Sequence, residues 1–253
     1  MRQPRAWSSE QSIGPMVILP AGGNEVNRMK RSMVERDSEI QAQVLQELKW
    51  DTRVEATDVG VEVHDGVVRL TGIVNSYAEK VAAQDCAHRV TGVLDVANDI
   101  DVKIPGSHHR SDMDIAQAVR WELEWNVLVP HERIRSTVSD GWVTLEGSVN
   151  TWPQRTDAEN AIRYLAGVRG VTNKISVNAV ELETEDVRRA ILDALERRTE
   201  REARRIDVKV SDGTVALSGV VRTWLEKQAI LGAVGHAPGV RRVEDHLEID
   251  PYT

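Results

Sequence analysis

The hydrophobic and polar positions of the chain repeat three times. Asp-Gly pairs occur at 65–66, 140–141 and 212–213, so the intervals are 75 residues (140 − 65) and 72 residues (212 − 140). The same intervals relate further glycines, which are Gly72, Gly147 and Gly219, and Gly92, Gly167 and Gly239. Self-similarity at a fixed interval is typical of tandem structural units. We therefore expect three domains, at residues 37–104, 112–179 and 184–251, preceded by a mobile N-terminal tail of residues 1–36.

Each repeat begins with a pattern that predicts an amphipathic helix. Ile40, Val44 and Leu48 are spaced i, i+4 and i+8, which places them on one face of a helix. The repeats open with residues whose side chains can accept a hydrogen bond from free helix amides, so we expect these to be the N-caps: Asp37, Asp112 and Thr184.

A β-hairpin follows the first helix. Val59, Val61 and Val63 alternate with other residues up to Asp65-Gly66, a dipeptide that favours a two-residue type I′ turn. Such a turn pairs residues whose numbers add up to 131, for example Val63 with Val68 and Val59 with Gly72. Because Gly72 has no side chain, we expect a helix to approach the sheet closely at that position, and likewise at Gly147 and Gly219.

The second helix of each repeat is predicted from a capping pattern. Ser76, Thr151 and Thr223 are each followed three residues later by Glu79, Gln154 and Glu226, which predicts a capping box in every repeat. We expect the helix to end at the second repeated glycine, in a left-handed cap at Gly92, Gly167 or Gly239. A short apolar strand completes the repeat. The order is αββαβ, so the predicted fold class is α+β, with three tandem two-layer domains and two helices on one face of each three-stranded sheet. The strand order does not follow from the pattern.

At these residues the chain resembles the BON domain (bacterial OsmY and nodulation). The resemblance covers about residues 37–251 and depends on the αββαβ order and on the glycine after the second strand, here Gly72, Gly147 or Gly219. It implies a non-enzymatic module that binds phospholipid or another envelope component and that is found in osmotic-stress and transport-associated proteins. It also implies an alternative function, a cytoplasmic module that senses an ion such as potassium or a small ligand, because some relatives sense potassium.

Composition and charge exclude several other classes of protein. The net charge of −8 argues against a nucleic-acid partner. The single cysteine, Cys86, excludes a disulfide framework within one chain, and its place on the predicted inner helix face indicates a small core residue. With 4% aromatic residues and no Phe, the cores must consist of Val, Ile, Leu and Ala. No apolar run is long enough for a transmembrane helix.

The N-terminal residues carry no pattern of an export signal, so we expect a cytoplasmic protein, whereas the resemblance implies periplasmic residence as the alternative. We also expect that translation starts at Met29 or Met33 rather than at Met1.

No catalytic motif, metal-ligand spacing or cofactor-binding loop is present, so we expect no catalytic residue, no metal and no cofactor. Two features suggest a surface for anionic phospholipid or an envelope protein. One is an aromatic column at the start of the second helices, and the other is a basic run near residue 200: Tyr77, Trp152 and Trp224; Arg197, Arg198, Arg201, Arg204 and Arg205. The alternative for the aromatic column, and for Trp50, Trp121, Trp125 and Trp142, is that each ring covers a helix end or a contact between neighbouring domains. For the basic run the alternative is a solvated, ion-paired loop.

Overall fold

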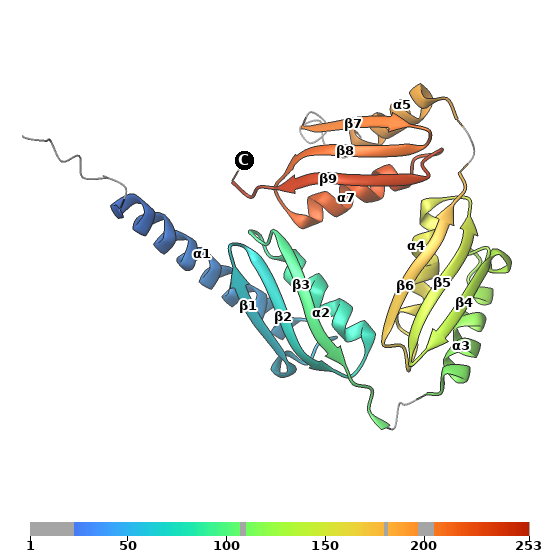
Figure 1. Ribbon diagram of the computed structural model, residues 1–253, viewed down its shortest axis with the longest axis horizontal. Coiled ribbons are helices and arrows are strands. Elements are labelled where there is room, and N and C mark those ends of the chain that lie inside the picture. The colour runs from blue at the N-terminus through green and yellow to red at the C-terminus, as the bar shows by residue number, and fades with distance from the viewer. Residues whose placement is uncertain (1–22, 107–109, 180–181, 197–204, 253) are drawn as a thin grey trace, which may run out of the picture.

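A computed structural model describes residues 23–106, 110–179, 182–196 and 205–252. In this part of the chain the fold consists of three successive α+β domains, each with helices over one three-stranded sheet (Figure 1). The predicted fold class is therefore confirmed.

The three domains have the same order of elements. Domain 1 contains α1 (Gly23–Trp50), β1 (Val59–His64), β2 (Val67–Val74), α2 (Tyr77–Arg89) and β3 (Asp95–Val102). Domain 2 contains α3 (Asp112–Trp125), β4 (Ile134–Ser139), β5 (Trp142–Val149), α4 (Trp152–Ile162) and β6 (Gly170–Val177). Domain 3 contains α5 (Thr184–Glu196), β7 (Ile206–Ser211), β8 (Thr214–Val221), α7 (Trp224–Gly235) and β9 (Arg242–Ile249).

The hairpin register is the predicted one. Val63 pairs with Val68 and Val59 with Gly72, and the turn residues Asp65 and Gly66 both have positive φ, 49° and 77°, as a type I′ turn requires. The third strand adds parallel to the second, which gives the orders β1-β2-β3, β4-β5-β6 and β7-β8-β9. The third strand of each domain, which pairs across the second helix, thus forms one edge of the sheet, and the first strand forms the other edge.

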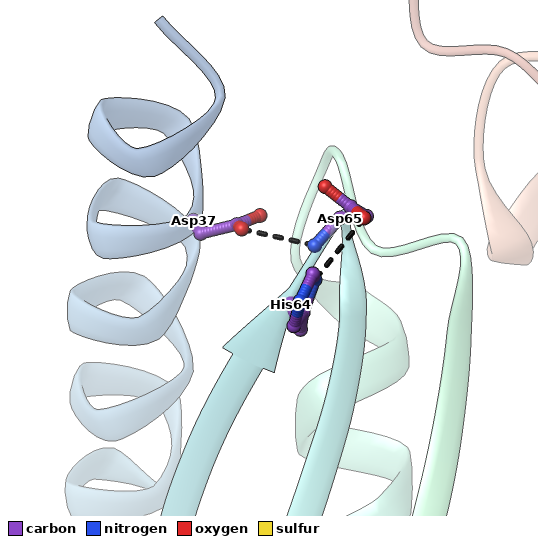
Figure 2. A group of neighbouring side chains, drawn as sticks. All are labelled: Asp37, His64 and Asp65. Atoms are coloured by element: carbon purple, nitrogen blue, oxygen red, sulfur yellow. Dashed lines mark hydrogen bonds and ion pairs between the residues drawn. The ribbon is translucent and has the colours of Figure 1, made fainter. Parts of the chain in front are cut away.

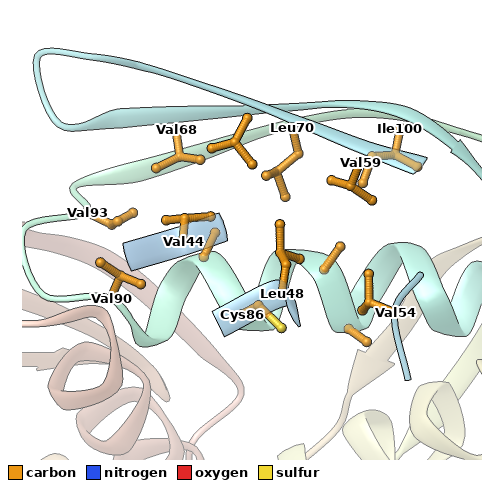
Figure 3. Packing of buried hydrophobic residues seen from close by; sticks show 14 of the residues in the cluster. Val44, Leu48, Val54, Val59, Val68, Leu70, Cys86, Val90, Val93 and Ile100 are labelled. Atoms are coloured by element: carbon orange, nitrogen blue, oxygen red, sulfur yellow. The ribbon is translucent and has the colours of Figure 1, made fainter. Parts of the chain in front are cut away.

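The core of each domain lies between the sheet and its two helices. In domain 1, Val44 and Leu48 of α1 are fully buried against Leu70 of the sheet (Figure 3). Cys86 is buried in the same cluster, and burial raises the pKa of its thiol to about 12. The prediction that Cys86 is a core residue is confirmed, and its thiol is almost entirely protonated at neutral pH.

The first helix corrects the prediction for its N-cap. It begins at Gly23 and not at Asp37, so residues 23–36, which we assigned to the N-terminal tail, are helical. Asp37 is therefore not an N-cap: its carboxylate accepts hydrogen bonds from the turn amides of Asp65 (2.9 Å) and Gly66 (3.0 Å). The remainder of the predicted tail, residues 1–22, lies outside the described residues.

Domain 2 shows the same use of the first carboxylate. The N-cap of α3 is Ser111, in a capping box with Asp114, while Asp112 accepts hydrogen bonds from the amides of Asp140 and Gly141, both at 2.8 Å. Sequence pattern placed these aspartates at the helix start, but the amides that need an acceptor belong to a hairpin turn 28 residues further along the chain. The carboxylate thus ties the helix to the turn.

We expect Asp112→Ala to lower the free energy of unfolding of domain 2 by about 1.5–3 kcal/mol, because it removes two hydrogen bonds to a charged acceptor. Urea denaturation followed by circular dichroism measures the change. Glu124→Ala, which removes an exposed carboxylate from the same helix, is the control. Equal stability of the two variants would show that the hydrogen bonds from the turn amides to Asp112 do not stabilise the hairpin.

The predicted N-caps of the second helices are confirmed, but the full capping box is present in only one of these three helices. Ser76, Thr151 and Thr223 each accept a hydrogen bond from the amide three residues on. The reciprocal bond to the N-cap amide is present only in domain 2, from Thr151 to Gln154. In domains 1 and 3 the Glu79 and Glu226 carboxylates instead accept from the amide one residue earlier, at Asn75 and Arg222.

The helix ends and the second-strand glycines differ in detail from the prediction. Gly92, Gly167 and Gly239 have positive φ, but the helices end at least three residues before them. At Gly72 the close neighbour is the carbonyl oxygen of Asp58, in the short 3₁₀ turn Ala56–Asp58 before β1, and not one of the two α-helices: a Cβ at Gly72 would collide with that oxygen. Gly147 and Gly219 have the same relation to the carbonyl oxygens of Arg133 and Arg205.

Candidate functional site

The aromatic column does not form one open surface. Tyr77, Trp152 and Trp224 are the first residues of α2, α4 and α7, and each is partly buried. Each aromatic ring packs against another domain, so the structure brings every ring to a contact between domains.

Trp224 of domain 3 lies on His88 of domain 1. The two rings are stacked, with centroids 4.0 Å apart and an angle of 19° between their planes. His88 is only 6% exposed, and burial lowers the pKa of its imidazole to about 4, against the opposing effect of Asp95. His88 is therefore neutral at physiological pH, which suits a flat stack on an indole ring.

Trp152 of domain 2 lies on Gly235 of domain 3. A Cβ at Gly235 would stand 2.7 Å from Cδ1 of Trp152, so only glycine allows the indole to approach the helix this closely. The guanidinium of Arg155, on the same helix as Trp152, lies 5.1 Å from the ring centroid. The indole thus contacts both its own helix and the next domain.

Tyr77 of domain 1 packs against the core of domain 2. Burial raises the pKa of its hydroxyl, and the carboxylate of Glu159 raises it further, while the charge of Arg163 and a hydrogen bond with the backbone of Val171 oppose both. The hydroxyl end of the side chain therefore reaches β6 of domain 2.

The residues that receive Trp152 and Trp224 are equivalent positions of the repeat, and Arg163, whose charge acts on Tyr77, is the third such position. His88, Arg163 and Gly235 are separated by 75 (163 − 88) and 72 (235 − 163) residues, the intervals that relate the repeats. Domain 1 docks its aromatic residue on domain 2, domain 2 on domain 3, and domain 3 on domain 1. The contacts run head to tail and close on themselves, in agreement with the triangular arrangement of the domains in Figure 1.

The basic run is mostly outside the described residues. This applies to Arg197, Arg198, Arg201 and Arg204, whereas Arg205 is described and exposed. The backbone carbonyl of Arg205 covers Gly219, so this residue has a structural role through its main chain.

Exposed apolar side chains gather instead at the end of α3. Trp121 and Trp125 are 64% and 84% exposed, and the turn after the helix adds Val127 (95%) and Leu128 (62%). We call these four residues the helix-end patch. Trp121 and Trp125 are one helical turn apart, away from the buried stripe of Ile115, Val119 and Leu123. That spacing is the sequence signal for the patch. Trp50, at the corresponding end of α1, is also 73% exposed.

Trp142 differs from the other exposed indoles. It lies on the outer face of β5, covers Gly170 and donates a hydrogen bond from Nε1 to Oγ1 of Thr172 (2.8 Å). Contacts within its own sheet therefore account for its position.

A second group of polar side chains lies at the first hairpin turn. Potential ligand atoms of Asp37, His64 and Asp65 lie within 4.8 Å of one another, and Nδ1 of His64 is 3.1 Å from Oδ2 of Asp65 (Figure 2). The carboxylate of Asp37 already accepts from two turn amides, as Asp112 does in domain 2, where Ser139 stands in place of His64. The hydrogen bonds explain the cluster without an ion.

Sequence comparison provides an independent test of the repeat. The sequence model of the BON domain matches the chain three times, over residues 36–104, 111–179 and 183–251. The chain belongs to the BON domain family. The family resemblance inferred from the glycines and the αββαβ order is confirmed.

Individual relatives are more distant. Osmotically-inducible protein Y of Escherichia coli K12 is 28% identical over 145 residues, which are 55% of this BON-domain chain and 71% of that protein. Two solved structures of CdsD, a structural protein of the type III secretion system of Chlamydia trachomatis, match at 14% identity. They cover 81% and 83% of this chain and 90% and 96% of their own chains, with a TM-score of 0.23.

Among the described residues, no helix combines the length and the apolar character needed to cross a bilayer.

Proposed function

We propose that this BON-domain protein is a non-enzymatic binding protein, associated with osmotic stress, that contacts a phospholipid surface through the helix-end patch. The association with osmotic stress is supported by the name of its relative, osmotically-inducible protein Y. The contact with lipid is supported by one observation above all, the exposure of two tryptophans and two aliphatic side chains together at the end of α3.

The composition of the patch suits the interface of a bilayer. Indole rings combine apolar area with a polar N–H group, and they are enriched where hydrocarbon meets head groups. Val127 and Leu128 are in a turn, so they project from the end of the helix rather than line a groove. Four side chains offer too small an area for a stable protein–protein interface, whereas shallow insertion into a bilayer requires no larger area.

The charges near the patch predict how binding depends on salt. Arg120, Arg133 and Arg135 are balanced by Glu122, Glu124 and Glu132 in the same stretch of sequence. We therefore expect insertion to depend on apolar contact rather than on attraction to anionic head groups. The anionic lipid expected from the basic run is not required by this proposal.

Vesicle flotation tests the proposal. The full chain should float with vesicles of phosphatidylcholine alone, at low and at high salt. The double variant Trp121→Ala/Trp125→Ala should bind at least about tenfold more weakly, because partial transfer of two indole rings is worth more than about 1.4 kcal/mol. Trp142→Ala, which removes an exposed indole outside the patch, should bind like the unmodified chain.

Two results would contradict the proposal: full binding by the double variant, or binding that needs phosphatidylglycerol and disappears at high salt. The second result would favour the basic run 197–205 as the contact. The cytoplasmic location expected from the sequence stays a prediction, and subcellular fractionation tests it.

A further inference from the structure

We infer that the contact of domain 3 with domain 1 is a latch, which closes the chain into a ring and which, when it opens, accepts a second copy of this chain. The inference is independent of the proposed lipid contact. It rests on the equivalence of three contacts: a donor aromatic residue at the start of the second helix, and an acceptor position near the end of the second helix of the next domain.

An aromatic residue at the start of a second helix is used in the same way in all three domains. The aromatic residues are Tyr77, Trp152 and Trp224. Trp152 meets Gly235 and Trp224 stacks on His88, while Tyr77 packs against the core of domain 2. A head-to-tail contact forms a closed ring if its rotation closes and an open assembly if it does not. Here it closes after three domains, within a single chain.

The donors are held in place by their own domains. Nζ of Lys227 lies 5.7 Å from the Trp224 ring centroid and donates to the carbonyl oxygen of Leu247 (2.9 Å). Arg155 beneath Trp152 donates from Nε to the carbonyl oxygen of Ile175 (3.0 Å). In each case a basic side chain ties the start of the helix to the third strand. The aromatic residue is therefore presented in a fixed position before the next domain docks.

The third contact differs from the other two in connectivity. Domains 1 and 2, and domains 2 and 3, are consecutive in the chain, whereas domains 3 and 1 are joined only through domain 2. Besides the Trp224–His88 stack, the guanidinium of Arg36 on α1 lies 4.9 Å from the ring centroid of Tyr252, near the C-terminus. Both contacts link the ends of the array. Because Arg36 and Tyr252 are exposed and His88 is buried, the Trp224–His88 stack is the main contact, and its loss opens the ring without cutting a linker.

Opening the latch leaves a complementary pair of surfaces on one chain. The free Trp224 end matches the free His88 end, and the same contact can then form between two chains. Closure within one chain is favoured at ordinary concentrations, because a tethered partner acts at an effective concentration of the order of millimolar. The closed chain is therefore monomeric, and the open chain is able to associate.

A complementation experiment tests the latch. Trp224→Ala removes the donor and leaves the His88 acceptor free, and His88→Ala removes the acceptor and leaves the Trp224 donor free. Each variant alone should be an expanded monomer by sedimentation and small-angle scattering. Mixed at about 1 mM, the effective concentration that the tether supplies, they should form a 1:1 complex of twice the mass. In that mixture the Trp224 indole N–H resonance of the His88→Ala chain should return toward its position in the closed chain.

Trp142→Ala is the matched control, because its indole covers Gly170 and donates to Thr172 within domain 2. It should stay compact and should form no complex with either variant. His88→Asn replaces His88→Ala if the alanine variant loses helical circular dichroism. Variants that stay as compact as the unmodified chain, or a mixture without a complex, would overturn the inference.

Discussion

Replacing Gly147 by alanine is expected to lower the free energy of unfolding of domain 2 by at least about 3 kcal/mol. Gly147 has φ of +133°, a conformation that side chains rarely adopt, and an added Cβ would collide with the carbonyl oxygen of Arg133. The collision is with backbone, so the loop before β4 would have to move away from the sheet. Urea denaturation followed by far-ultraviolet circular dichroism measures the loss.

Gly232→Ala provides the control for this substitution. Gly232 lies within α7, and nothing is within 4 Å of the position that a Cβ would take. Alanine is the better helix former by about 1 kcal/mol, so this variant should be as stable as the unmodified chain or more stable. If Gly147→Ala is equally well tolerated, the backbone contact at the second strand does not constrain the domain.

Acidification is expected to weaken the closed form of the chain by about 3 kcal/mol between pH 6.5 and pH 4. Burial under Trp224 lowers the pKa of His88 to about 4 from its ordinary value of 6.5, against a smaller opposing effect of Asp95. Because the closed form favours the neutral ring, this contribution is complete above pH 6.5. It is lost as the pH falls from 6.5 to 4, since the exposed ring binds a proton first.

The stability of the unmodified chain and of His88→Asn, measured by denaturation at several pH values, tests this dependence. The difference between the two slopes isolates His88, because the other titrating groups are common to both chains. The unmodified chain should lose stability faster below pH 6.5. Equal slopes would show that His88 is not buried as a neutral ring.

The sequence predicted the parts of the fold that depend on neighbours in the chain. The Asp-Gly turn and the alternation of Val59, Val61 and Val63 determine the hairpin register together, because a slip of one residue would turn the apolar face outward. The parallel addition of β3 was not predictable in the same way, since its partner lies across a helix and no local pattern specifies it.

The errors of the sequence analysis arose where the partner is distant. Asp37 and Asp112 have the residue type of an N-cap, but the amides that they bind are 28 or 29 residues away. The space at Gly72 is limited by a loop carbonyl that precedes β1, which the spacing of glycines does not reveal. In both cases the residue was correctly singled out and its neighbour was not.

In the candidate site, too, the sequence identified the residues but not their neighbours. Alignment of the repeats found the column of Tyr77, Trp152 and Trp224, but only the structure shows that each ring lies against another domain. The helix-end patch was visible as Trp121 and Trp125, and its significance follows from their exposure. Because the residues of the aromatic column lie between domains, we propose the helix-end patch as the apolar surface that contacts lipid.

The most direct test of the closed array is the distance between domains 1 and 3. Spin labels on Glu62→Cys and Lys209→Cys would occupy equivalent, exposed positions of β1 and β7, and the buried thiol of Cys86 should remain unlabelled. Double electron–electron resonance should give one narrow distance distribution, which broadens when Trp224→Ala is added. A broad distribution in the chain without Trp224→Ala would contradict the closed ring.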